Sequence, residues 1–448
     1  KTNFGEINVV INPSWPSGLS TSIICGLDYL KEKVPNLEYV VFLVCDQPYL
    51  KASNIQAIVD EFYLNHQPIV ASDYEGIQGT PALFESSFFE EIRKLSGDRG
   101  AMSIIKKYAN QFFVELGSNE NTYGPSPRVR EVILDHLHAL HRYPDPLGAD
   151  LKHAIALKHS IKSEQILLGN GSHELLMMIA QVFSGPETQV LASQYGFAVY
   201  ALAAQAAGAE LMLANALPAD AQQSRGHDLE GLSSAINEKT RLIYLANPNN
   251  PTGTWFSSSA FADFMAKVPG DVLVIVDEAY LEFVTVSELQ SALALISQFE
   301  NLIVARTFSK AYGLAGLRVG YIVAHPECVA VMERVRESFN VNLLGLAASE
   351  AALGDDAHLQ WVIEKNASER DWLIEQFHGR GLKCGPSQTN FVLVDFQKDS
   401  ADIEAQCVAN AVVLRPMRGY GLPNCLRVTI GNRDENRQLL KILDEVLA

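Results

Sequence analysis

The sequence predicts an α/β fold whose mainly parallel sheet carries a reactive site at the carboxyl ends of its strands. Apolar strands alternate with amphipathic helices along most of the chain. Strongly apolar runs occur at residues 242–246, 272–276 and 302–305. Because these runs are continuous rather than alternating, they indicate strands that are buried on both faces of a sheet.

The bulk properties fit most soluble cytosolic enzymes. A length of 448 residues predicts two or three domains. The net charge of -17 disfavours nucleic acid and anionic membrane surfaces as partners. No apolar run reaches the roughly 18 residues that a membrane helix needs, and the six cysteines include no CxxC pair. We therefore expect a soluble, cytoplasmic protein with reduced thiols.

A glycine-rich turn near residue 170 is followed by a predicted helix. The letters SHELLMMIAQVF, which start at residue 172, place apolar residues at helical spacing. Ser172 is expected to be the N-cap of this helix, with Glu174 in its first turn. Gly171, Ser172 and His173 would then offer backbone N–H groups to a phosphate at the positive end of the helix.

Polar side chains follow each of the three apolar runs. Asn250 follows the first run, Asp277 and Tyr280 follow the second, and Ser309 and Lys310 follow the third. Because ligands of open parallel sheets bind at the carboxyl ends of the strands, these side chains are expected to share one site. A lysine and a carboxylate in one site fit pyridoxal phosphate, whose aldehyde forms an imine with the lysine while the carboxylate keeps the pyridine nitrogen protonated.

The remaining groups that this cofactor needs can also be assigned. Tyr280 and Asn250 can donate hydrogen bonds to the phenolic oxygen of the cofactor. Ser309 and Arg318 can add a hydroxyl and a cation to the phosphate site. Arg318 ends the glycine-containing stretch AYGLAGLR, which lets the backbone pass close to a phosphate.

The ends of the chain predict further segments. A loop at 118–127 precedes a predicted helix from Arg128 to about His141. From about Phe339 the pattern is helical, and strands are expected at 390–394, 412–414 and 426–430. These last segments indicate a second, smaller α/β lobe.

Five motifs in this order resemble the fold-type I pyridoxal-phosphate aminotransferases, and the histidinol-phosphate aminotransferases most closely. They are GNGSHELL, YLANPNNPTG, VIVDEAY, TFSKAYGLAGLRVGY and LPNCLRVTIGNRDEN. The resemblance covers residues 114–448. It implies a large domain at 163–338 with a mainly parallel seven-stranded sheet, and a small domain at 114–162 and 339–448.

The resemblance also implies a role for each site residue. Lys310 would be the Schiff-base lysine and would move the proton between the substrate Cα and the cofactor C4′. The cofactor would be held by Ser172, His173, Phe197, Asn250, Asp277, Tyr280, Ser309 and Arg318, with Tyr143 reaching it from the neighbouring subunit of a homodimer. Core packing is an equal interpretation of Phe197. Arg427, Arg415 and Asn119 would bind substrate, and the expected contacts of Arg427 are to substrate alone.

Residues 1–113 resemble part of a second family, the molybdenum-cofactor nucleotidyltransferases. The matching letters are NPSWPSGLSTSI, VCDQPYL, GIQGTPALF and LSGDRGA. The resemblance implies a truncated Rossmann-like fragment in which Asp46 would bind Mg²⁺ and Asp98 would be structural. The glycine-rich nucleotide loop and the closing aspartate segment of that family are not found, so we expect no nucleotidyl transfer. No other metal site is predicted.

The predicted reaction converts L-histidinol phosphate and 2-oxoglutarate into imidazole-acetol phosphate and L-glutamate, within histidine biosynthesis. Four alternatives remain open at this point, and one of them is a non-catalytic fusion that binds pyridoxal phosphate but does not turn over. Aromatic aminotransferases and threonine-phosphate decarboxylases share the cofactor-binding motifs. A metal-dependent nucleotidyltransferase, fused to the C-terminal part, is the alternative from another class.

Overall fold

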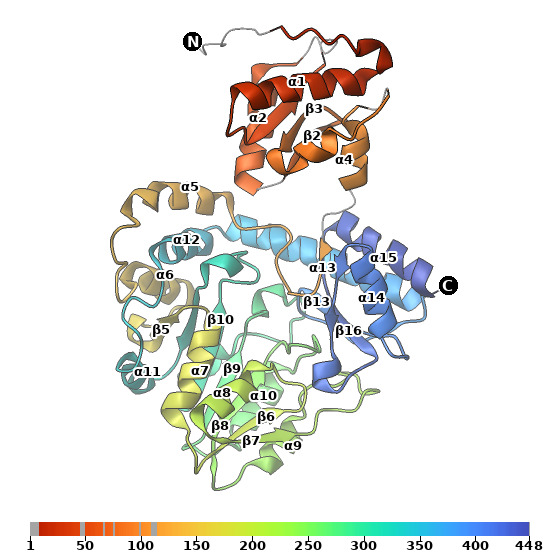
Figure 1. Cartoon of the computed structure of the whole chain (residues 1–448). Helices are drawn as coiled ribbons and strands as arrows, with labels where there is room; N and C mark the ends of the chain where they lie inside the picture. The colour runs from red at the N-terminus through yellow and green to blue at the C-terminus, as the bar shows by residue number, and fades with distance from the viewer. Residues whose placement is uncertain are drawn as a thin grey trace. The chain divides into compact units, whose positions relative to one another are not determined.

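The computed structural model describes residues 9–44, 50–65, 68–74, 77–97, 100–108 and 114–447. The chain divides into two compact units, Lys1–Phe113 and Val114–Ala448 (Figure 1). No helix among the described residues is both long enough and apolar enough to cross a membrane.

The second unit is built around a seven-stranded sheet with the strand order β5-β11-β10-β9-β8-β6-β7 (Figure 1). Strand β11 runs antiparallel to both of its neighbours, and the other strand pairs are parallel. The mainly parallel sheet expected from the sequence is thus confirmed. The strands are Ile166–Gly169 (β5), Gln189–Ser193 (β6), Glu210–Ala214 (β7), Thr240–Ala246 (β8), Leu273–Asp277 (β9), Leu302–Thr307 (β10) and Gly320–Val323 (β11).

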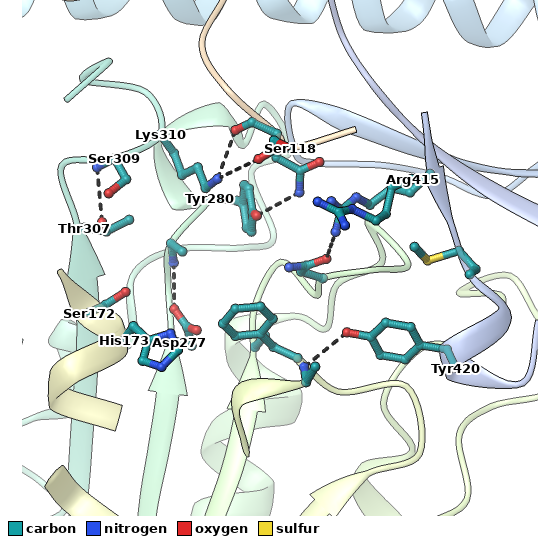
Figure 2. A pocket seen from close by; sticks show the side chains of 18 of the residues that line it. Ser118, Ser172, His173, Asp277, Tyr280, Thr307, Ser309, Lys310, Arg415 and Tyr420 are labelled. Atoms are coloured by element: carbon teal, nitrogen blue, oxygen red, sulfur yellow. Dashed lines mark hydrogen bonds between the residues drawn. The ribbon is translucent and has the colours of Figure 1, made fainter. Parts of the chain in front are cut away.

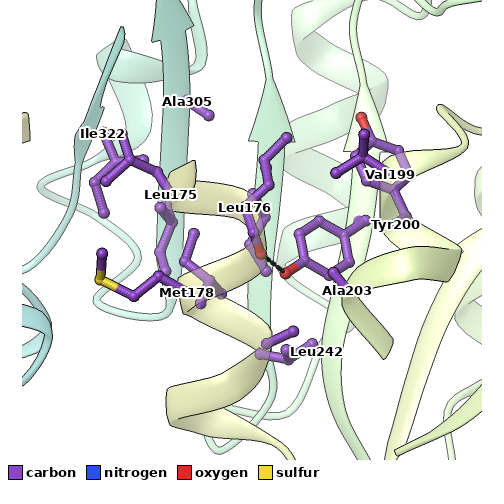
Figure 3. Packing of buried hydrophobic residues seen from close by; sticks show 14 of the residues in the cluster. Leu175, Leu176, Met178, Val199, Tyr200, Ala203, Leu242, Ala305 and Ile322 are labelled. Atoms are coloured by element: carbon purple, nitrogen blue, oxygen red, sulfur yellow. Dashed lines mark hydrogen bonds between the residues drawn. The ribbon is translucent and has the colours of Figure 1, made fainter. Parts of the chain in front are cut away.

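Helices cover both faces of this sheet, which explains the continuous apolar runs. Leu242 and Tyr244 of β8 pack with helices α7 (Ser172–Phe183) and α8 (Val199–Ala207) on one face. Ile243 and Leu245 pack with helices α9 (Leu229–Ala235) and α10 (Ser258–Met265) on the other. Figure 3 shows the first of these clusters, in which Leu175, Leu176 and Tyr200 lie against the strands. Because close packing on both faces holds the sheet rigid, the residues at the ends of its strands have well-defined positions.

The expectation that Ser172 is the N-cap of α7 was wrong. The helix begins at Ser172, and Gly171 is the N-cap with a φ of 81°. A positive φ of this size favours glycine, because glycine has no Cβ to clash with the backbone. No side chain caps the helix, so the first turn keeps N–H groups available to a ligand.

A four-stranded sheet, ordered β12-β13-β16-β15, and a parallel pair of β14 with β4 form a second core near the end of the chain. These strands are Val114–Glu115 (β4), Lys383–Cys384 (β12), Phe391–Asp395 (β13), Val412–Val413 (β14), Arg415–Pro416 (β15) and Cys425–Thr429 (β16). The accompanying helices are Asp356–Gly379 (α13), Ala401–Ala409 (α14) and Arg433–Leu447 (α15).

Three further helices share a core with strands β5 and β11. They are Pro127–His136 (α5), Ala149–His159 (α6) and Leu343–Leu353 (α12). Helix α5 ends at His136 and continues only as a 3-10 turn, Leu137–Ala139, so it is shorter than the sequence predicts. Helix α11 (Pro326–Glu333) follows β11.

The first unit contains a small antiparallel sheet with the order β1-β3-β2. Its strands are Tyr39–Phe42 (β1), Ile69–Tyr74 (β2) and Ile77–Glu85 (β3). Its helices are Leu19–Lys33 (α1), Ala52–Asn65 (α2), Phe89–Ile92 (α3) and Met102–Tyr108 (α4). A compact core that includes Leu27, Val40 and Phe84 holds this unit together.

Candidate active site

A cavity of about 470 Å³ lies at the carboxyl ends of strands β8, β9 and β10 (Figure 2). It brings together every site residue predicted in residues 114–448 except Tyr143. These are Asn119, Ser172, His173, Phe197, Asn250, Asp277, Tyr280, Ser309, Lys310, Arg318, Arg415 and Arg427. Segments far apart in the sequence therefore meet here, as the rule for open parallel sheets predicts.

The amine of Lys310 is held at one side of the cavity. Its Nζ donates to the backbone oxygens of Asn119 at 3.0 Å and of Ser118 at 3.3 Å. Burial lowers the pKa of Lys310 to about 8, and the charge of Arg427 acts in the same direction. About a tenth of the amine is therefore neutral at pH 7, far more than for an ordinary lysine, and the neutral form is the one that attacks an aldehyde.

The carboxylate of Asp277 is buried at the floor of the cavity. Its Oδ1 accepts from the N–H of Ala279 and its Oδ2 accepts from the hydroxyl of Tyr200, each at 3.2 Å. Burial raises the pKa of Asp277 to about 6. A protonated ring nitrogen brought into the cavity would oppose this effect and restore the charged carboxylate.

Tyr200, the hydrogen-bond partner of Asp277, was not predicted from the sequence. Its ring packs edge-on against Phe197, with 5.9 Å between the ring centroids, and stacks on Tyr244 at 4.9 Å. The spacing of three residues between Phe197 and Tyr200, at the start of a helix, was the available signal. Phe197 lines the cavity and also packs on the core, so its core packing is confirmed and its stacking on a cofactor ring stays a prediction.

The hydroxyl of Tyr280 is oriented by Asn119. Asn119 Nδ2 donates to the Tyr280 oxygen at 2.9 Å, and Asn119 is only 1% exposed. Since the oxygen accepts this bond, the proton of Tyr280 remains available to a ligand in the cavity. Asn119 therefore positions a second residue, in addition to lining the cleft as predicted.

The side-chain amide of Asn250 is oriented by Arg427. Arg427 Nη1 donates to Asn250 Oδ1 at 2.7 Å, and Arg427 Nη2 donates to the backbone oxygen of Gly117 at 2.7 Å. Arg427 is thus also bound to the chain itself, and its contact with substrate stays a prediction. An arginine has no acceptor, so Asn250 must present its oxygen to Arg427, which leaves Asn250 Nδ2 free to donate elsewhere.

The start of α7 forms a cradle that fits a phosphate. A Cβ at Gly171 would come within 2.7 Å of Arg318 Nη2, so the guanidinium occupies the space beside this glycine. A Cβ at Gly320 would come within 2.3 Å of the Ser172 nitrogen. Ser309 lines the same cavity, and its N–H is held by Thr307 Oγ1 at 3.1 Å. Uncapped N–H groups, a hydroxyl and a cation together suit a phosphate dianion.

Among the described residues, Tyr143 is the predicted site residue that does not line the cavity. Tyr143 is 81% exposed, and its ring stacks on Phe339 with 4.6 Å between centroids. Asp46 and Asp98 lie outside the described residues. In the part of the chain that the structure describes, no three His, Cys, Asp or Glu side chains are grouped to hold a metal ion.

Comparisons with known proteins identify both parts of the chain. Residues 113–443 match the model of the aminotransferase class I and II family, and residues 2–112 match the MobA-like NTP transferase domain. The histidinol-phosphate aminotransferase 1 of Nitrosococcus oceani is 44% identical over 372 residues, which cover 83% of this chain and 96% of that protein. The corresponding protein of Mannheimia succiniciproducens is 42% identical, over 82% of this chain and 97% of its own length.

A solved structure agrees with these relatives. The crystal structure of histidinol-phosphate aminotransferase from Sinorhizobium meliloti in complex with pyridoxal-5'-phosphate matches with a TM-score of 0.70 and 31% identity. The match covers 81% of this chain and 98% of that one. Together with the cavity and its amine, carboxylate and phosphate cradle, these likenesses place the chain in the class I and II aminotransferases, as a pyridoxal-phosphate-dependent member of the histidinol-phosphate aminotransferase family.

Proposed function

We propose that this chain transfers the amino group of L-histidinol phosphate to 2-oxoglutarate, giving imidazole-acetol phosphate and L-glutamate. The observation that carries the proposal is that Lys310, Asp277 and the arginine pair Arg415 and Arg427 share one cavity. Relatives named for this activity are 42–44% identical to most of the chain. The reaction would serve histidine biosynthesis.

Lys310 and Asp277 are the proposed catalytic pair. Pyridoxal phosphate, when bound, supplies an electron sink for the negative charge that develops at the substrate Cα. Lys310 is the base that takes the Cα proton and the acid that returns one, because its lowered pKa lets it do both near neutral pH. Asp277 keeps the ring nitrogen protonated, and Tyr200 holds the carboxylate in place through its hydrogen bond.

The other cavity residues have positioning roles in this proposal. Tyr280 and Asn250 donate to the phenolic oxygen, since Asn119 and Arg427 leave their donor groups free. Phe197 packs against the cofactor ring. The cofactor phosphate is bound by the first turn of α7, through Ser172 and His173, together with Ser309 and Arg318.

The substrate's anionic groups are assigned to the two arginines. Arg415 and Arg427 lie opposite each other in the register of β15 and β16. A planar guanidinium binds either a phosphate or a carboxylate through paired N–H donors. One site can therefore serve both L-histidinol phosphate and L-glutamate, which a transaminase must bind in turn.

A homodimer is part of the proposal. Tyr143 is exposed, and so are Leu134, Leu137 and Leu140, which precede it in the sequence and are 44–59% exposed. A second copy of the chain would cover this apolar surface and would bring Tyr143 to the neighbouring cofactor phosphate. We also propose the large domain at 163–338 and the small domain at 114–162 and 339–448.

We propose the cytoplasm as the site of action. The five cysteines in the described residues, Cys25, Cys328, Cys384, Cys407 and Cys425, are all free thiols, which suits a reducing compartment.

The visible absorbance spectrum tests the main proposal. Wild-type protein mixed with pyridoxal phosphate should show a visible band that is missing in Lys310→Ala. L-Histidinol phosphate alone should convert this band to the spectrum of the aminated cofactor, and 2-oxoglutarate should restore it. A band that responds to L-glutamate but not to L-histidinol phosphate would overturn the proposed donor. Carbon dioxide released from threonine phosphate would favour the decarboxylase instead.

A further inference from the structure

Arg415 and Arg427 are two neighbouring positive charges that no carboxylate among the described residues neutralises. The two residues are direct partners across antiparallel strands, an arrangement in which like charges repel. Arg415 Nε and Arg427 Nη2 share one acceptor, the backbone oxygen of Gly117, at 3.2 Å and 2.7 Å. Among the described residues neither guanidinium has a carboxylate within ion-pair distance.

Unused donors at this pair point toward a ligand. Arg427 is 8% exposed, and its Nε has no partner. The charge of Glu115 is felt at Arg427, but Glu115 Oε1 already accepts from the Gly117 N–H at 2.7 Å. The described chain therefore supplies no counter-ion to the two arginines. An anionic ligand can reach them from the cavity that both residues line.

Tyr420 lies on the same wall of the cavity and was not predicted from the sequence. It ends the 3-10 turn Arg418–Tyr420, between strands β15 and β16. Figure 2 shows Tyr420 and Arg415 on one side of the cavity, across from His173 and Asp277. The turn thus brings a phenol hydroxyl to the wall that carries the arginines.

The oxygen of the Tyr420 hydroxyl accepts a hydrogen bond, and its proton remains available for donation. The oxygen accepts from the N–H of Ala198 at 3.1 Å, at the N-cap position of α8, which no side chain of that segment caps. In the described part of the chain no acceptor lies within hydrogen-bond distance of the proton. Burial raises the pKa of Tyr420 despite the nearby charges of Arg427 and Arg415, so the hydroxyl remains a donor.

We propose that Tyr420 is the third donor of the substrate's anion site and that it distinguishes a phosphate from a carboxylate. The proposal rests on the proposed function, which requires one site to accept both anions. A phosphate presents three terminal oxygens in a tetrahedral arrangement, whereas a carboxylate presents two in a plane. Two guanidinium groups can satisfy a carboxylate, and the third phosphate oxygen needs a further donor that lies out of that plane.

Tyr420 has a purely structural alternative role, which must be separated from this one. Its bond to Ala198 lies beside Phe197, so loss of the hydroxyl could disturb the cofactor ring instead. A disturbed ring would slow the reactions of both amino donors by similar factors. Loss of a phosphate donor would slow only the reaction of the phosphorylated one.

The test compares the two half-reactions of the holoenzyme. In Tyr420→Phe we expect kcat/KM for L-histidinol phosphate to fall about tenfold or more, as for a lost hydrogen bond to a charged group. The value for L-glutamate should change by less than about twofold. Inorganic phosphate, used as a competitive inhibitor of the L-glutamate half-reaction, should bind about tenfold more weakly to the variant.

Tyr195→Phe is the matched control. Tyr195 packs in the same apolar cluster as Tyr420, and its hydroxyl contacts Gln194 at 3.3 Å but does not line the cavity. This control should leave both half-reactions and the inhibition by phosphate unchanged.

The outcomes separate this proposal from the proposed function. Equal losses with both donors, or an unchanged inhibition constant for phosphate, would overturn the role of Tyr420. If wild-type enzyme reacts with L-glutamate but not with L-histidinol phosphate, the proposed function fails. In that event the inhibition constants for inorganic phosphate, wild type against Tyr420→Phe, still decide whether Tyr420 is a phosphate donor.

Discussion

Asn250 and Arg427 lie 177 positions apart in the sequence, and a hydrogen bond of 2.7 Å from Arg427 Nη1 to Asn250 Oδ1 joins them at the cavity. One residue is assigned to the cofactor and the other to the substrate. Because of this bond, Arg427 also sets the direction in which the side-chain amide of Asn250 donates.

Arg427→Met should therefore affect the cofactor as well as the substrate. We expect kcat/KM for either amino donor to fall about a hundredfold, because a charge-assisted contact is lost. We also expect the pKa read from the visible band of the bound cofactor to rise by about half to one unit, because Asn250 Nδ2 is no longer aimed at the phenolic oxygen. Absorbance titration measures this shift, and Asn250→Ala should reproduce it. A band that titrates as in wild type would refute the link between the two residues.

Cofactor uptake should depend on the protonation of Lys310. The neutral amine is the reactive form, and the pKa of Lys310 is lowered to about 8. The rate of uptake by cofactor-free protein should therefore rise about tenfold per pH unit below pH 8 and level off above it. Stopped-flow absorbance measures this rate. In Arg427→Met the midpoint should move to higher pH, since a nearby positive charge is removed. A wild-type midpoint near 10 would show that the amine is not perturbed.

Asp277 should reduce the stability of the protein when the cofactor is missing. Its pKa is raised from 3.8 to about 6 in the folded state. Between these values the folded state binds more protons than the unfolded state, so stability falls as pH rises from about 4 to 6 and stays lower above that. Asp277→Asn should remove the cost of burying a charged carboxylate. The cofactor-free variant should therefore be about 2 kcal/mol more stable than cofactor-free wild type at pH 8.

Urea unfolding of cofactor-free protein at pH 4 and pH 8 checks the Asp277 prediction. The difference between variant and wild type should become small at pH 4, where the Asp277 carboxyl of the folded wild type is protonated and uncharged like the asparagine side chain. Pyridoxal phosphate should reverse the order at pH 8, because only the carboxylate can pair with the ring nitrogen. A variant that is less stable than wild type at both pH values would contradict burial as the main cause of the raised pKa of Asp277.

Tyr143 offers a test of the dimer. If Tyr143 acts at the neighbouring site, chains carrying Tyr143→Ala and chains carrying Lys310→Ala should complement each other. Each mixed dimer would contain one site with both residues intact, so mixing and reassembling the two weakly active variants should recover about a quarter of the wild-type rate, as random pairing predicts. Activity that does not exceed the sum of the separate variants would place Tyr143 outside the neighbouring site. Sedimentation gives the oligomeric state independently.

Residues that follow strands could be predicted from the sequence, and residues that join distant segments could not. Lys310, Asp277 and Asn250 follow apolar runs, and the parallel sheet carries them to one edge. The contact of Tyr280 with Asn119 spans 161 positions, and that of Tyr420 with Ala198 spans 222. Such pairs are set by the packing of one lobe on another, for which local pattern contains no signal.

The error at Ser172 has a local cause. Serine is a common N-cap, and its place after a glycine made this interpretation natural. The backbone at Gly171 instead takes a φ that serine disfavours, so the glycine becomes the cap and the helix starts one residue earlier than expected. Composition alone does not reveal which of two neighbouring residues has the unusual backbone angle.

Strand β4 anchors the segment that carries Ser118 to the second core of the molecule. Val114 and Glu115 pair in parallel register with Val412 and Val413, and only two residues separate this pairing from Ser118, whose oxygen holds the Lys310 amine. Leu116, directly after β4, is buried in the same core as Val412. Replacing the segment ahead of residue 114 is therefore expected to leave the backbone oxygen of Ser118 beside the Lys310 amine.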